Sequence, residues 1–130
     1  MIRYLDTSAA MKLLVEEDES AALLAELQRS GPNDRLIASW LLHTELHCAA
    51  SRHPDAIDLE AVAVLLDSVD LIDLFRGDLL TAAVLPGRLR SHDAIHLAVA
   101  LRVGAHEVVT YDEELARATA EAGLAVSAPD

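Results

Sequence analysis

The feature that most limits the fold of this chain is a regular alternation of short apolar segments with longer segments of helical periodicity. The helical segments are residues 8–15, 19–29, 40–52, 58–66, 78–85, 91–102 and 113–122. Short runs rich in strand-forming residues accompany them at 2–5, 36–38, 71–74, 107–110 and 124–127. Strands that alternate with helices favour a three-layer α/β fold, with a central parallel sheet flanked by helices.

Length and composition predict one domain over residues 1–130. The chain is 52 % hydrophobic and contains no linker or repeat, so it can bury a sizeable core. No apolar run approaches the ~18 residues that a transmembrane helix needs, and Asp6 comes too early for a secretory signal peptide. The single cysteine, Cys48, excludes an intrachain disulfide and favours the reducing cytoplasm. We expect Cys48 to be buried in the core.

The formal net charge of −12 argues against a generic nucleic-acid coat and against a protein that binds anionic membranes. The charge is nevertheless uneven on a finer scale. Between residues 79 and 106 the single acid is Asp93, and the bases are Arg88, Arg90 and Arg102. The acidic balance therefore excludes broad, non-specific binding to nucleic acid.

Two acids come directly after predicted strands. Asp6 follows the first strand, and Asp112 follows the 107–110 strand after one further residue. In open parallel sheets the reactive crevice lies outside the carboxyl ends of the strands. We therefore expect both carboxylates at this edge of the sheet.

Two further acids lie on apolar helix faces. At about 100° per residue, Leu46 lies at about +40° from Leu42, and Glu45 lies at about −60°, inside the apolar stripe. The helix 91–102 is apolar nearly all round, and its internal polar residues are Asp93 and His96. A carboxylate on a core-facing stripe costs free energy unless something compensates its charge.

These four acids could converge on one acidic pocket. Four like charges raise one another's pKa, so such a pocket needs a cation. Oxygen ligands favour Mg²⁺, or Mn²⁺ in its place, over zinc or copper. The pattern therefore predicts a metal site made by Asp6, Glu45, Asp93 and Asp112.

Each acid also has a purely structural interpretation. Asp6 and Asp112 could cap the helices that follow them. Glu45 could pair with an arginine such as Arg52, and Asp93 could interact with the dipole of its helix. The sequence by itself leaves these alternatives open.

The histidines are less specific. His43 and His47 are four residues apart on one helix, but Glu45 lies about 200° away from each, so the three cannot share one ion. We expect His43 and His47 to be solvated. We expect His96 to be a hydrogen-bonded histidine beside the site rather than a metal ligand.

Four segments together resemble the PIN-domain family, and most closely its VapC-type toxins of prokaryotic toxin–antitoxin pairs. The segments are Tyr4-Leu5-Asp6-Thr7-Ser8-Ala9, Glu45 followed by Arg52, Arg90-Ser91-His92-Asp93-Ala94-Ile95-His96-Leu97-Ala98, and Val109-Thr110-Tyr111-Asp112. They occur in the family's order and span essentially the whole chain.

The resemblance implies a PIN fold and a Mg²⁺-dependent ribonuclease. The family's acidic residues correspond to Asp6, Glu45, Asp93 and Asp112. Its hydroxyl near the fourth acid corresponds to Thr110, and the one after the first acid to Ser8 or Thr7. His92 departs from the family, whose members usually carry an apolar residue there, and could alter substrate contacts at the pocket mouth. The resemblance also implies a small VapB-like antitoxin partner and a homodimer.

The function that follows is a cytoplasmic endoribonuclease, in which a metal-activated water hydrolyses RNA phosphodiesters and leaves 5′-phosphate and 3′-hydroxyl ends. Arg88 and Arg90 are candidates for guiding the RNA strand. The alternative is a catalytically silent PIN-like module that binds proteins. A phosphatase or receiver domain with an aspartyl phosphate is disfavoured, because Ser8 stands where a second acid would be needed and Lys12, the only lysine, lies in the first helix.

Overall fold

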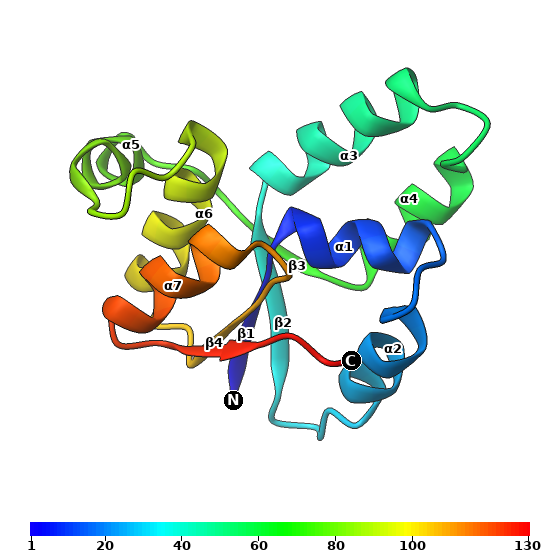
Figure 1. Ribbon diagram of the computed structural model, residues 1–130, viewed down its shortest axis with the longest axis horizontal. Coiled ribbons are helices and arrows are strands. Elements are labelled where there is room, and N and C mark those ends of the chain that lie inside the picture. Colours follow the sequence, from blue (N-terminus) through cyan, green and yellow to red (C-terminus); the bar gives the residue numbers. More distant parts are fainter.

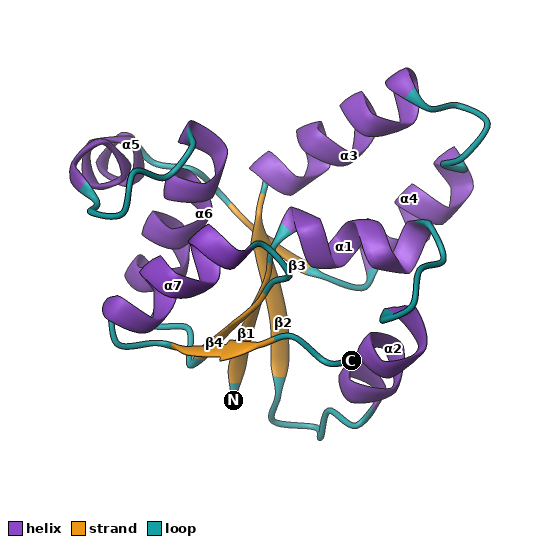
Figure 2. Ribbon diagram, viewed as in Figure 1, coloured by secondary structure: helices purple, strands orange, loops and turns teal.

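A five-stranded parallel sheet forms the centre of the computed structural model, which describes residues 1–130 (Figures 1 and 2). The strands are β1 (Ile2–Leu5), β2 (Arg35–Ser39), β3 (Asp70–Ile72), β4 (Glu107–Val109) and β5 (Ala125–Ser127), in the spatial order β3-β2-β1-β4-β5. Every neighbouring pair is parallel. The predicted parallel sheet is confirmed.

Seven helices cover the two faces of this sheet. They are α1 (Thr7–Leu14), α2 (Ser20–Gln28), α3 (Leu41–Arg52), α4 (Leu59–Asp67), α5 (Arg76–Val84), α6 (Ser91–Arg102) and α7 (Glu113–Glu121). Figure 1 shows α1 to α4 on one side of the strands and α5 to α7 on the other. The three-layer arrangement is therefore confirmed as well.

The hydrophobic core has one part on each face of the sheet, because successive side chains of a strand point to opposite faces. Leu5 of β1 and Val109 of β4 pack with residues of α1, α3 and α4. The preceding residues, Tyr4 and Val108, pack on the opposite face with Val99 of α6. Successive strand residues point to opposite faces, so both faces of these short strands are buried.

The chain reverses its direction of strand addition between β1 and β4. From β1 it adds β2 and then β3 on one side, and then returns to place β4 and β5 on the other. Such a switch point opens a crevice at the carboxyl ends of the two strands. Asp6 follows β1 at this crevice, and Thr110 follows β4.

Every predicted element exists, and most bounds differ by one or two residues. The helix predicted over 78–85 begins earlier, at Arg76, because an Asp78 carboxylate oxygen accepts the Phe75 backbone N–H at 2.9 Å and so caps an earlier turn. The expectation of a buried Cys48 is wrong: its side chain is exposed, because it lies about 200° around α3 from the buried Leu46. None of the helices is long and apolar enough to cross a membrane.

Candidate functional site

Asp6 lies at the switch point with one carboxylate oxygen held and the other free. It is 1 % exposed. Its Oδ2 accepts hydrogen bonds from Ser8 Oγ at 2.7 Å and Thr110 Oγ1 at 2.9 Å, and a longer one from the Ser8 N–H at 3.3 Å. Its Oδ1 is buried and has no hydrogen-bond partner. The predicted helix-capping role is therefore real, but it occupies a single oxygen of the carboxylate.

The parallel pairing of β1 and β4 brings Thr110 to Asp6. Leu5 pairs with Val109, so the next residue of each strand meets its counterpart at the sheet edge. The Thr110 hydroxyl also accepts the Asp112 backbone N–H at 3.1 Å. Thr110 thus fixes the start of the loop that carries Asp112.

Asp112 caps α7. Its Oδ1 accepts the Leu115 N–H at 2.8 Å, and its Oδ2 makes no hydrogen bond. The structural interpretation of this acid is again correct for one oxygen. The other oxygen is available on a partly exposed side chain.

Asp93, in the first turn of α6, is 3 % exposed, and its Oδ2 is buried without a partner. His92 Nε2 lies 3.4 Å from its Oδ1. Burial, with the negative charges of Asp112 and Asp6, raises the pKa of Asp93 to about 6 against the opposing charge of His92. Asp93 therefore interacts electrostatically with both acids of the sheet edge.

Glu45 reaches the other side of the crevice from α3. Its Oε1 accepts Thr7 Oγ1 at 2.8 Å and lies 2.6 Å from His96 Nε2, while its Oε2 makes no hydrogen bond. Burial raises the pKa of Glu45, but its hydrogen bonds with His96 and Thr7 oppose burial and the pKa is lowered overall. The partner of Glu45 is thus His96, and Arg52 forms no ion pair with it.

The four carboxylates share one pattern: the chain engages one oxygen and leaves the second free. No three His, Cys, Asp or Glu side chains are arranged to hold a metal ion directly. The Ser8 hydroxyl donates a hydrogen bond to Asp6, and the Thr7 hydroxyl donates one to Glu45. The sequence left open which of these two hydroxyls accompanies the first acid.

The arginines before α6 and the histidine pair of α3 lie at the surface. Arg88 and Arg90 are exposed in the loop before α6, and their side chains make no hydrogen bond or ion pair. His43 and His47 stack on each other with ring centroids 4.3 Å apart, and His47 is exposed. Tyr4, whose hydroxyl lies 2.6 Å from His96 Nδ1, is a site neighbour that sequence reasoning missed.

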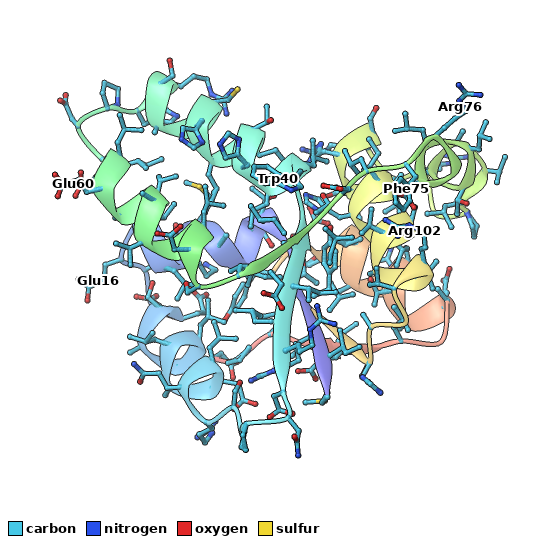
Figure 3. The ribbon with its side chains drawn as sticks, turned by 180° about the vertical axis from the view of Figure 1, so that it is seen from behind. Glu16, Trp40, Glu60, Phe75, Arg76 and Arg102 are labelled. Carbon is cyan, nitrogen blue, oxygen red and sulfur yellow. The ribbon has the colours of Figure 1, made fainter.

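A second hollow lies away from the carboxylates, between α1, α2 and α4. It encloses about 1130 Å³, and half of its 18 lining residues are hydrophobic. Leu24 and Val64 line it and are exposed, and Glu16 and Glu60, which are labelled in Figure 3, contribute acidic side chains. This groove contains none of the four acids of the sheet edge.

The chain belongs to the PIN-domain family, whose sequence model matches residues 3–121. Within that family, the ribonuclease VapC47 of Mycobacterium tuberculosis is 35 % identical over 130 residues, which cover 97 % of this chain and 96 % of the relative.

Solved structures of the same fold include a VapBC-1 complex from nontypeable Haemophilus influenzae. It has a TM-score of 0.75 at 18 % identity, with 98 % of this chain and 97 % of the other covered. The Mycobacterium tuberculosis toxin VapC20, described as cleaving the sarcin–ricin loop, has a TM-score of 0.72 at 18 % identity. The match covers 98 % of this chain and 99 % of that one.

Proposed function

We propose that this protein is a Mg²⁺-dependent endoribonuclease and the toxin of a VapBC-type pair. The observation that carries the proposal is the set of free carboxylate oxygens at the sheet edge. Two of them, Asp6 Oδ1 and Asp93 Oδ2, are buried without any partner. The ribonuclease name of a relative at 35 % identity over nearly the full length supports the same activity.

The donor set fits Mg²⁺. A buried, unpartnered carboxylate oxygen is costly, and a hard cation that prefers oxygen ligands removes that cost. Mg²⁺ usually keeps several waters and binds through one or two carboxylates, which agrees with a site where no three acids converge directly. Asp6 and Asp93 would hold the ion, while Glu45 and Asp112 would act through bound water. Mn²⁺ would bind the same oxygens.

Neighbouring side chains hold one oxygen of Asp6 and one oxygen of Glu45 in place. Ser8 and Thr110 hold Oδ2 of Asp6, which leaves the buried Oδ1 without a partner. Thr7 and His96 orient Glu45 in the same manner. A bound Mg²⁺ would supply positive charge for the scissile phosphate and a more acidic water as the nucleophile. The chain itself would need no histidine as a general base.

RNA is the substrate class that this surface supports. The unpaired charges of Arg88 and Arg90 lie a few residues before Asp93, so they would attract phosphates to the crevice. His92, which is partly exposed beside Asp93, would contact the strand at the mouth of the crevice. The net charge of −12 restricts this binding to a small, local footprint.

The proposed partners are an antitoxin and a second copy of the chain. Structures of the same fold include complexes named VapBC, which supports a VapB-like antitoxin, one that could place a basic side chain in the acidic crevice. Exposed apolar side chains on and beside α5, namely Phe75, Leu79, Leu80 and Val84, favour self-association. Phe75 and Arg76 mark this surface in Figure 3. The cytoplasm, where RNA is abundant, is the proposed compartment.

The test combines RNA cleavage with metal binding. Wild-type protein should cleave RNA in Mg²⁺, leave 5′-phosphate ends and lose activity in chelator. Asp6→Asn and Asp93→Asn should abolish cleavage, whereas Asp67→Asn, at an exposed position of α4, should not. Undiminished cleavage by either site variant would reject the assignment. Absence of Mg²⁺ binding at millimolar concentration, measured by calorimetry, would favour the protein-binding module instead.

A further inference from the structure

A row of buried hydrogen bonds crosses the core and ends at Glu45. The Ser39 backbone N–H donates to the Tyr4 hydroxyl at 3.1 Å. The same hydroxyl lies 2.6 Å from His96 Nδ1, and His96 Nε2 lies 2.6 Å from Glu45 Oε1. Tyr4 is 0 % exposed and His96 is 1 % exposed. The row therefore links β2, β1, α6 and α3, and water does not reach Tyr4 or His96, whereas Glu45 at its end is partly exposed.

The donors and acceptors of this row allow one arrangement of protons on a neutral His96. A backbone N–H can only donate, so the Tyr4 oxygen accepts from Ser39. The hydroxyl proton of Tyr4 then has a single acceptor within reach, His96 Nδ1. Because a neutral imidazole carries one proton, that proton lies on Nε2 and points at Glu45.

Two further observations support this arrangement. Burial raises the pKa of Tyr4, so its hydroxyl keeps the proton that it must donate. On the Glu45 side, an unprotonated Nε2 would face a carboxylate oxygen at 2.6 Å with two lone pairs opposed. The only other hydroxyl there, that of Thr7, already donates to the same carboxylate oxygen.

We propose that Tyr4 is a positioning residue: it fixes the tautomer of His96, whose Nε2–H holds Glu45 Oε1 and turns Oε2 toward the metal. The proposal rests on the proposed function, in which Glu45 helps to hold Mg²⁺. Partners behind the ligands of a metal orient them and tune their affinity. Here that support comes from Tyr4, a buried residue of β1 that contacts His96 of α6.

The Tyr4 hydroxyl lies among apolar side chains, where filling space does not by itself require a polar atom. Ile37, Val99, Ala100 and Val108 surround it in one cluster, where a phenylalanine would fill nearly the same space without a polar atom. A buried hydroxyl costs free energy unless it is hydrogen-bonded. The Tyr4 hydroxyl is hydrogen-bonded to Ser39 and to His96, and His96 is hydrogen-bonded in turn to Glu45.

The experiment reads the tautomer and the metal affinity separately. Nitrogen-15 NMR of the metal-free wild-type protein should place the His96 proton on Nε2. Tyr4→Phe leaves Glu45 as the one remaining group that favours a proton on Nε2, so a fraction of the Nδ1–H tautomer should become detectable and Mg²⁺ binding should weaken by about tenfold or more. RNA turnover should fall in kcat, with KM little changed. Tyr111→Phe is the matched control, since it removes a hydroxyl that donates to Pro129 O and should leave Mg²⁺ affinity unchanged.

A double-variant cycle separates this role from a structural one. The side-chain amide of His96→Gln can donate to Glu45 but cannot change tautomer. In that background, adding Tyr4→Phe should cost no further Mg²⁺ affinity. An equal loss in both backgrounds would overturn the proposal, and so would a wild-type His96 protonated on Nδ1. If the wild-type protein fails to bind Mg²⁺, the proposed function is wrong, whereas the position of the His96 proton tests the row by itself.

Discussion

Replacing Asp93 with asparagine should stabilise the metal-free protein while it abolishes activity. Asp93 is buried with an unpartnered oxygen, and burial raises its pKa from 3.8 to about 6. A raised pKa means that the folded chain disfavours the charged form. A difference of about two pKa units corresponds to about 3 kcal/mol at neutral pH. Because the new amide also needs partners, we expect a gain of about 1–3 kcal/mol.

The gain depends on pH in a defined direction. Between about pH 4 and pH 6 the folded wild-type protein binds more protons at Asp93 than the unfolded chain does, so this group lowers the free energy of unfolding as pH rises. The advantage of Asp93→Asn should therefore be full at pH 7.5 and fall below about 1 kcal/mol at pH 4.

Thermal and urea unfolding in chelator would measure the effect, with Asp67→Asn as the exposed control. A gain of 1 kcal/mol corresponds to about 4 °C in Tm for a chain of this size. Addition of Mg²⁺ should stabilise the wild-type protein and leave the variant nearly unchanged. The reasoning is refuted if Asp93→Asn is no more stable than wild type at pH 7.5, or if its gain is the same at pH 4.

Three further predictions concern the surroundings of the site. Ser8→Ala and Thr110→Val should each weaken Mg²⁺ binding by about tenfold, because Asp6 loses a donor that orients it; calorimetry that finds unchanged affinity would contradict this. Replacing both Arg88 and Arg90 with alanine should make the salt dependence of RNA binding shallower by about 1.4 in logarithmic slope, measured in the inactive Asp6→Asn background. An unchanged slope would show that the RNA does not contact them. Arg102→Met should destabilise the fold by about 2 kcal/mol without changing Mg²⁺ affinity, since buried Asp78 loses its ion pair; equal stability in urea would refute it.

The local pattern of the chain was sufficient to place the secondary structure. Short apolar runs and helical periods depend on neighbouring residues, so they can be recognised without knowing the fold. Gly104 and Gly123 follow α6 and α7 with φ of 71° and 91°, as expected for residues that end helices in the left-handed region. The exposed Cys48 shows that residue type alone is a poor guide to burial, because the helical period places it about 200° from the buried Leu46, on the outer face of α3.

The sequence by itself determined the types of element and the parallel sheet, and it predicted the four acids at one edge, because strand ends and helix faces follow from local periodicity. It could not determine how each carboxylate is held. Thr7 and His96 hold Glu45 from 38 and 51 positions away along the chain, and Thr110 holds Asp6 from 104 positions away. The hydrogen bonds from Tyr4 through His96 to Glu45 join three elements that meet only after the sheet has assembled. Tertiary structure alone decided those partners, because hydrogen bonding depends on distance in space rather than on separation along the chain.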